Sequence, residues 1–233
     1  VRKISGELFE YTKATEFIAI TKEIEVKARE IIGPISLDED LYEIVFKVAD
    51  WTRNNIEYSL NTLTAEVNQK SSWVLEKKYG VCDEITNLFI SFMRSLGIPA
   101  RFVSGVIYSN LDYKFSNHGW AEVYFPDHGW VPFDVTLGQY GWLSPDHVRL
   151  KDDFDSGTPA VFYSWSAEGI DMNISKINIE TKVESVGIPI ASPIEISTYA
   201  LEGKVKFGSY VPLAVIVTNK KDYYVSTQVA IAK

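Results

Sequence analysis

The feature that most constrains this chain is a glycine-containing turn followed directly by an amphipathic helix, at residues 79–96. Gly80 permits a sharp turn before the helix, and the Gly-Ile-Pro sequence at 97–99 ends it. The only cysteine of the chain, Cys82, is therefore predicted to lie at the N-terminus of this helix. The apolar residues have the spacing of a helix that buries one face: Ile85, Leu88, Phe89, Phe92, Met93 and Leu96.

Two interpretations of Cys82 follow from this position. Free N–H groups and the helix dipole favour an anion at a helix N-terminus, so a thiolate there is expected to have a lowered pKa. Alternatively, Cys82 is a small buried apolar residue, because free cysteines are among the most buried residue types. A cysteine nucleophile needs a base and a group that orients the base, so the rest of the chain decides between the two.

Composition excludes several classes of protein. The chain has 233 residues, of which 46% are hydrophobic and 23% charged, as is typical of a globular protein. Its net charge of −8 argues against a nucleic-acid partner. One cysteine and three histidines make a zinc site improbable, and no sequence motif calls for a cofactor. No apolar run approaches the roughly 20 residues of a membrane span.

The chain divides into a helical part, a mixed part and a β-rich part. Residues 7–31 are predicted to be helical, and a second helix is predicted to follow an N-cap signal at 36–39. Residues 59–72 are polar and are expected to form a loop that borders a cleft. Strands are predicted after the Cys82 helix at 101–108, 118–125 and 129–135, with a turn at 126–129 and one more short strand or turn at 146–150.

The last part of the chain is predicted to be almost entirely β. We place a boundary between residues 1–158, which hold the helices and the mixed core, and a β-rich extension at 159–233. The acidic residues 151–157 resemble the start of a calcium loop, but the twelfth position is Ser164 where glutamate is required. The strand candidates in the extension are 174–183, 194–198, 211–218 and 223–232.

His118 and Asp134 are the candidate partners of Cys82 and flank the turn of the predicted hairpin. Histidine suits both proton acceptance and proton donation at neutral pH, and aspartate can hold its tautomer. If paired residues of the hairpin sum to an even number, the two side chains share a face, whereas an odd register separates them. His128 is expected to face solvent in the turn. His147 could be a second pocket residue or a loop residue, and the loop is the favoured interpretation.

Three sequence blocks together resemble the transglutaminase-like core, a papain-related α+β fold with helices packed on an antiparallel sheet. The resemblance covers residues 73 to about 150, and it implies that Cys82 is the nucleophile, His118 the general base and then acid, and Asp134 the orienting group. The first block is Gly-Val-Cys-Asp-Glu at 80–84, and the second is Leu-Gly-Ile-Pro-Ala-Arg-Phe-Val-Ser-Gly at 96–105. The third block consists of the two strands of the predicted hairpin, at 118–124 and 129–136.

The resemblance implies acyl transfer on amide bonds of a protein, peptide or cell-wall peptide substrate through a thioester on Cys82. The oxyanion is expected to be held by the backbone N–H of Cys82 and a second donor. Candidates for that donor, or for lining the pocket, are Trp73, Gln69, Asn68 and Trp120. Because the sequence contains no recognisable calcium motif, we expect hydrolysis rather than cross-linking to an amine.

Three alternatives stay open. The chain could be a transglutaminase that joins glutamine to amines, a non-catalytic binding or scaffolding module that kept the fold, or a structural surface protein with an embedded core. The cellular location is equally open: a single thiol fits the cytoplasm, whereas a first residue other than methionine and a β-rich tail fit an exported, processed chain.

Overall fold

The structure is a computed structural model that describes residues 6–35, 40–60, 68–109, 113–161 and 191–227, with isolated positions between 164 and 188. Its helical elements precede its main sheet in the chain. They are η1 (Gly6–Thr12, a 3₁₀ helix), α1 (Lys22–Ile32), α2 (Leu41–Asn55), α3 (Ser71–Lys77) and α4 (Cys82–Ser95). The strands are β1 (Glu57–Tyr58), β2 (Tyr79–Gly80), β3 (Ala100–Ser109), β4 (Lys114–Phe125), β5 (Gly129–Asp134), β6 (Gln139–Tyr140), β7 (His147–Asp153), β8 (Ile194–Ala200) and β9 (Leu213–Asn219).

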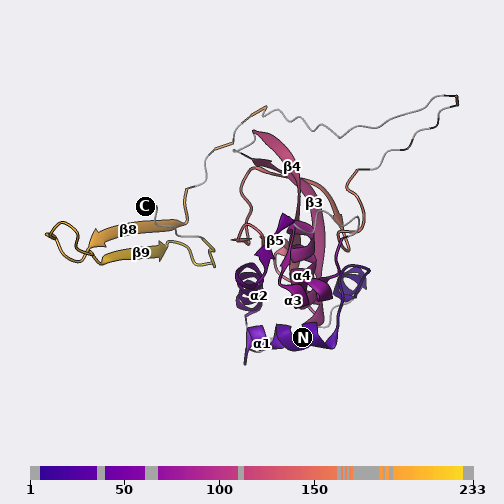
Figure 1. The fold of residues 1–233 in the computed structure, drawn as a ribbon, viewed down its shortest axis with the longest axis horizontal. Coiled ribbons are helices and arrows are strands. Elements are labelled where there is room, and N and C mark those ends of the chain that lie inside the picture. The colour runs from indigo at the N-terminus through magenta and orange to yellow at the C-terminus, as the bar shows by residue number, and fades with distance from the viewer. Residues whose placement is uncertain are drawn as a thin grey trace. The chain divides into compact units, whose positions relative to one another are not determined.

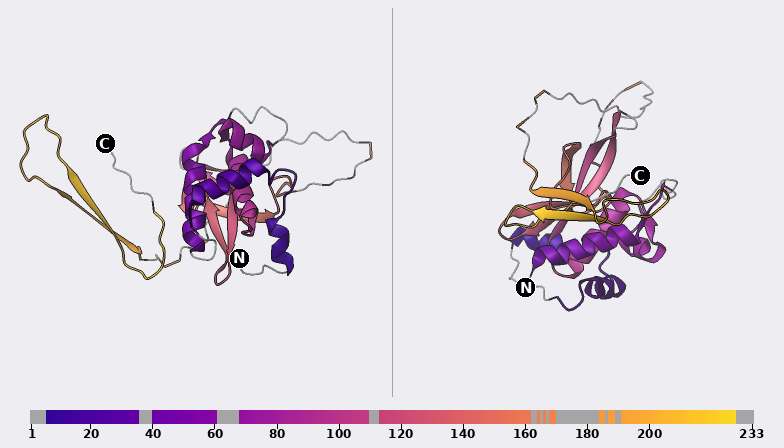
Figure 2. Two further views of the ribbon diagram at one scale, coloured as in Figure 1. Left: turned by 90° about the horizontal axis from the view of Figure 1, so that it is seen from below. Right: turned by 90° about the vertical axis from the view of Figure 1, so that its left-hand side faces the viewer.

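Helix α4 lies at the centre of the larger unit, against strands β3 and β4 (Figure 1). The five-stranded antiparallel sheet has the order β6-β5-β4-β3-β7. Side chains from one face of this sheet, such as Val123 and Phe133, form a single apolar core with α1, α2 and α4. Figure 2 shows the ribbon of this unit from two further sides, with the helices against the sheet. The predicted α+β fold, with helices on an antiparallel sheet, is therefore confirmed.

The β4–β5 hairpin has the even register. Tyr124 pairs with Trp130 and Ala121 pairs with Phe133, so side chains at even positions of both strands share one face. The pairing continues through Pro132 without a bulge, although a proline cannot donate to the ladder. This register places His118 and Asp134 on the same face as diagonal neighbours.

The helix predicted over residues 7–31 is not continuous, and this expectation was wrong. η1 ends at Thr12 and α1 begins at Lys22, with Thr21 as the N-cap. Tertiary hydrogen bonds hold the segment between them in a non-helical form: the N–H of Ala19 donates to the hydroxyl of Ser71 at 2.8 Å, and the carbonyl of Phe17 accepts from the backbone N–H of Ser71. Long-range bonds have overridden the local helical pattern.

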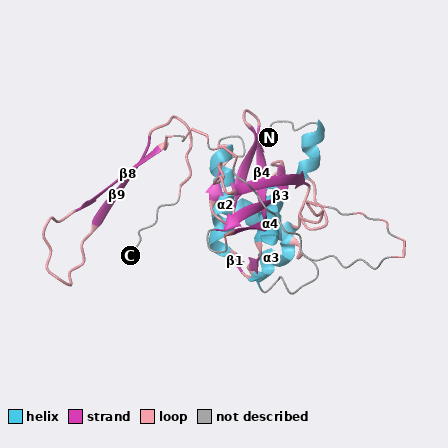
Figure 3. Ribbon diagram, turned by 90° about the horizontal axis from the view of Figure 1, so that it is seen from above, coloured by secondary structure: helices cyan, strands magenta, loops and turns pink. Residues whose placement is uncertain are grey.

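The chain separates into two compact units: Val1–Glu180 with Gln228–Lys233, and Thr181–Thr227. Within the second unit, β8 and β9 pair as an antiparallel hairpin (Figure 3), which confirms the strands predicted at 194–198 and 211–218. The predicted strand at 174–183 lies outside the described residues. Positions 223–227 hold no strand, and the rest of that candidate also lies outside the described part. The boundary at 158/159 stays a prediction.

Candidate active site

Cys82 is the first residue of α4, as the sequence predicted, and it is half-buried. Its sulfur accepts a hydrogen bond from the backbone N–H of Gly119 on β4, the residue next to His118. The thiol also lies 3.5 Å from Oδ1 of Asp83. The helix N-terminus thus brings the sulfur against the strand that carries the candidate base.

The lowered pKa expected for Cys82 is not what the structure gives. Burial raises the pKa of the thiol, and the carboxylate of Asp83 raises it further. The N–H of Gly119 acts in the opposite direction but does not compensate for these effects. Desolvation of the charged form therefore outweighs the helix terminus, and the thiol needs a nearby base to lose its proton.

Glu84 holds the turn that presents Cys82. The residue is 2% exposed, and its carboxylate accepts two backbone N–H bonds. Oε2 accepts from Val81, and Oε1 accepts from Gln69, both at 3.0 Å. One buried side chain therefore connects the turn before Cys82 to the loop that precedes α3.

We expect Glu84→Ala to lower the free energy of unfolding by about 2–6 kcal/mol, because the backbone N–H groups of Val81 and Gln69 lose their acceptor at about 1–3 kcal/mol each. Glu84→Gln should recover part of this loss, since the amide oxygen can still accept one bond. Urea denaturation measures the effect. Glu76→Ala is the matched control, because the Glu76 side chain is 70% exposed and its loss should cost under about 0.5 kcal/mol. Equal effects of Glu84→Ala and Glu76→Ala would contradict this role.

His118 and Asp134 form the tightest polar contact of the site. Nε2 of His118 lies 2.6 Å from Oδ2 of Asp134, and the two side chains are 7% and 0% exposed. Oδ1 of Asp134 accepts the backbone N–H groups of Thr136 and Leu137, each at 2.9 Å. Nε2 of His118 is therefore committed to Asp134, and Nδ1 is the ring nitrogen left for proton exchange with a substrate or a thiol.

The carboxyl of Asp134 is held as an anion. Burial by itself would raise its pKa, but hydrogen bonds from His118 and His147 and the N–H of Leu137 outweigh burial and hold the pKa well below its usual range. Asp134 thus supplies a permanent negative charge to the imidazole of His118.

His147 is a member of this cluster that the sequence analysis assigned to a loop. It begins β7, which pairs with β3, and its Nε2 lies 3.1 Å from the same Oδ2 of Asp134 that contacts His118. The His147 side chain is 2% exposed. No local sequence signal distinguishes His147, because the sheet order and not the spacing along the chain brings it to Asp134.

Of the predicted oxyanion and pocket residues, Trp120 lies nearest the histidines. It is 2% exposed, and its ring centroid lies 6.2 Å from that of His118 and 5.4 Å from that of His147. Its Nε1 is buried and has no hydrogen-bond partner among the described residues. Trp120 therefore shields the imidazoles from water on this side.

The other three predicted residues make contacts that do not involve Cys82. Asn68 donates from its amide to Ser156 at 3.3 Å, and Gln69 donates its backbone N–H to Glu84. The ring of Trp73 packs edge-on against Tyr79, with centroids 5.1 Å apart. Their role as oxyanion donors stays a prediction.

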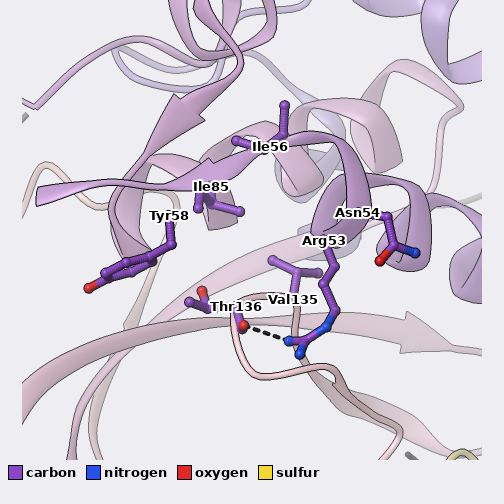
Figure 4. Close-up of a pocket in the computed structure, with 7 residues that line it drawn as sticks. All are labelled: Arg53, Asn54, Ile56, Tyr58, Ile85, Val135 and Thr136. Atoms are coloured by element: carbon purple, nitrogen blue, oxygen red, sulfur yellow. Dashed lines mark hydrogen bonds between the residues drawn. The ribbon is translucent and has the colours of Figure 1, made fainter.

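A pocket of about 390 Å³ is lined in part by residues that come shortly after Cys82 and Asp134 in the chain (Figure 4). Ile85 from α4 and Val135, next to Asp134, line it together with Arg53, Asn54, Ile56, Tyr58 and Thr136. Arg53 donates to the carbonyl of Thr136 at 2.6 Å. Tyr58 is half-exposed; the partial burial of its ring raises the pKa of its hydroxyl, and the negative charge of an ionised Cys82 and of Asp83 raises that pKa further. Tyr58, which the sequence analysis did not single out, is therefore a protonated donor within electrostatic reach of the thiol.

The side chains of this cluster are also of the kinds that bind metal ions. Within the described residues, His118, Asp134 and His147 each offer one ligand atom, and these atoms lie within 4.8 Å of one another. However, the Nε2 atoms of both histidines lie at hydrogen-bond distance from one oxygen of Asp134. An N–H on each Nε2 atom, donating to that oxygen, accounts for these distances without a metal ion. We interpret the cluster as a hydrogen-bonded network.

Comparison with known proteins finds a family model that matches the core. Residues 29–135 match the model of the Transglutaminase-like superfamily, and this range contains Cys82, His118 and Asp134. The uncharacterized protein YebA of Bacillus subtilis (strain 168) is 29% identical over 177 residues, which are 68% of this chain and 23% of YebA. The uncharacterized protein ML0607 of Mycobacterium leprae (strain TN) is 27% identical over 108 residues, which are 44% of this chain and 37% of that protein.

A solved structure supports the same fold. A protein of Cytophaga hutchinsonii, described as a candidate cysteine protease, superposes on this chain with a TM-score of 0.52 at 23% sequence identity. The match covers 66% of this chain and 49% of the Cytophaga chain. The chain thus spans less than half the length of the curated relatives it matches. Among the helices that the structure describes, none is long and apolar enough to cross a membrane.

Proposed function

Because residues 29–135 match the model of the Transglutaminase-like superfamily, we propose that this chain is a thiol-dependent acyl-transfer enzyme that acts on amide bonds of protein or peptide substrates. The observation that carries the proposal is the buried 2.6 Å contact between His118 and Asp134 on the strand whose Gly119 N–H binds the sulfur of Cys82. Nucleophile, base and orienting group are the parts that such chemistry needs.

In the proposed reaction, Nδ1 of His118 takes the proton of the thiol as Cys82 Sγ attacks the substrate carbonyl carbon. The backbone N–H of Cys82 and the hydroxyl of Tyr58 stabilise the resulting oxyanion. Collapse of this intermediate breaks the C–N bond, and the His118 imidazolium protonates the departing amine. A thioester on Cys82 remains. An acceptor deprotonated by His118 then attacks the thioester and restores the free thiol.

We propose water as the acceptor. The pocket beside the site contains the polar side chains of Arg53 and Asn54, and Asn54 and Tyr58 are exposed, so water has access to it. A primary amine as acceptor would make the protein a transglutaminase. The raised pKa of Cys82 favours a second candidate, a binding module whose thiol is idle.

The test uses a glutamine-containing peptide, with and without an added primary amine, and measures both ammonia release and the intact mass of the protein. We expect an acyl adduct on the native chain, no adduct on Cys82→Ala, and ammonia release that needs no amine. Release only when amine is supplied would replace hydrolysis with cross-linking. The absence of an adduct with both the peptide and thiol-directed acyl probes would favour the binding module.

A further inference from the structure

Both ring nitrogens of His147 face oxygen atoms that accept hydrogen bonds. Nε2 lies 3.1 Å from Oδ2 of Asp134, while Nδ1 lies 3.0 Å from Oδ1 of Asp146 and 3.1 Å from the carbonyl oxygen of Ser144. The Ser144 hydroxyl is the one neighbour of Nδ1 that can also donate, but it is the longest of these contacts at 3.3 Å and it donates to Oε1 of Gln139 at 3.2 Å. A neutral imidazole has one N–H and one lone pair, so its lone pair would face an acceptor on one side. Only the imidazolium donates to both.

The charges around His147 favour the same protonation state. Two carboxylates contact it, Asp134 from β5 and Asp146 from the preceding turn. The ring of His118 on β4 lies 5.6 Å away. Arg149, two residues along β7, is paired with Glu122 and Asp152. Burial by itself would lower the pKa of His147, but its bonds to Asp134, Ser144 and Asp146 raise it overall.

We propose that His147 is a positioning residue whose positive charge occupies one side of the Asp134 carboxylate and thereby keeps His118 neutral, so that His118 can accept the proton of Cys82. This inference rests on the function proposed above. If the Asp134 carboxylate contacted His118 alone, its whole negative charge would stabilise the protonated form of His118. A second cation on the same oxygen reduces that stabilisation and also repels a proton on His118.

A neutral His118 is what the thiol requires. Because burial and Asp83 raise the pKa of Cys82, the sulfur remains protonated until a base removes its proton. A His118 that Asp134 kept protonated could not act as that base. His147 thus keeps His118 able to accept a proton from a thiol that does not ionise readily. The proposed catalytic unit therefore has four members, which are Cys82, His118, Asp134 and the positioning residue His147.

The test is an NMR titration of the imidazole C–H signals in the full chain, which has only three histidines. We expect His147 to stay protonated to a higher pH than His128, which is exposed and serves as the internal reference. In His147→Gln, which keeps a donor but no charge, the midpoint of His118 should rise by about one to two pH units. His147→Lys, which keeps the charge, should restore part of the native midpoint.

Activity supplies a readout that a merely structural role would not move. The acidic limb of the rate profile should shift upward in His147→Gln by the same interval, and the rate should recover at high pH. An unchanged or lowered His118 midpoint in a folded variant would overturn the inference. So would a native His147 that titrates together with His128, which needs no variant at all. The titration uses no substrate, so its outcome is independent of the proposed activity. The titration can contradict the role of His147 while Cys82 is still acylated by the peptide, and it can support that role while no acylation is found.

Discussion

Replacing His118 by alanine is expected to lower the rate of Cys82 alkylation by iodoacetamide at pH 7 by about two to four orders of magnitude, the usual contribution of a general base. The structure gives the reason. The thiol of Cys82 is half-buried beside Asp83, and both burial and that carboxylate raise its pKa. Without the imidazole, the fraction of thiolate at neutral pH becomes very small.

The pH dependence of alkylation separates this effect from loss of structure. In the native chain, the rate should rise as His118 becomes able to accept the proton, whereas in His118→Ala it should rise only as the isolated thiol ionises at alkaline pH. His128→Ala is the matched control, because His128 lies exposed in the β4–β5 turn and should leave the profile unchanged. Identical profiles for the native chain and His118→Ala would show that Cys82 is not paired with a base.

The second large effect is expected for Asp134→Ala, which should lower the free energy of unfolding by about 3–5 kcal/mol, as removal of one partner of a buried ion pair does. Asp134 is 0% exposed and accepts from two histidines and from two backbone N–H groups, those of Thr136 and Leu137. All four donors would lose their acceptor. Denaturant unfolding followed by tryptophan fluorescence measures the loss.

The size of this loss should depend on pH with a defined sign. The pKa of Asp134 is depressed on folding, so its contribution is present above its unfolded value of about 3.9 and is lost as the pH falls below it. The pKa of His147 is raised on folding, so its contribution is present below about 6.5 and is lost as the pH rises through the folded value. The difference between native and Asp134→Ala should therefore be greatest between about pH 4 and pH 6.5.

Asp127→Ala provides the control for this experiment, since Asp127 is exposed in the turn beside His128. It should change stability by under about 0.5 kcal/mol at every pH. A loss in Asp134→Ala that is as small as this, or that does not vary with pH, would mean that the cluster around Asp134 contributes nothing to folding.

Much of the fold followed from local patterns. The period of the apolar residues after Glu84 predicted α4, and the alternation around the turn at 126–129 predicted the β4–β5 hairpin. These predictions succeeded because helix and strand periods are properties of a few consecutive residues. The same local pattern failed at residues 13–21, where hydrogen bonds to Ser71 hold an irregular segment that a helical period cannot reveal.

The sequence by itself determined the order of the Cys82, His118 and Asp134 blocks and the helix start that places the thiol. The structure decided between the even and odd registers that the sequence left open, and the even register puts the His118 and Asp134 side chains on one face. Only the tertiary structure decided how their charges behave. Burial reversed the expected direction of the Cys82 pKa, and the pairing of β7 with β3 brought His147 to Asp134. Desolvation and contacts between distant strands depend on the packed chain, and no short stretch of sequence encodes them.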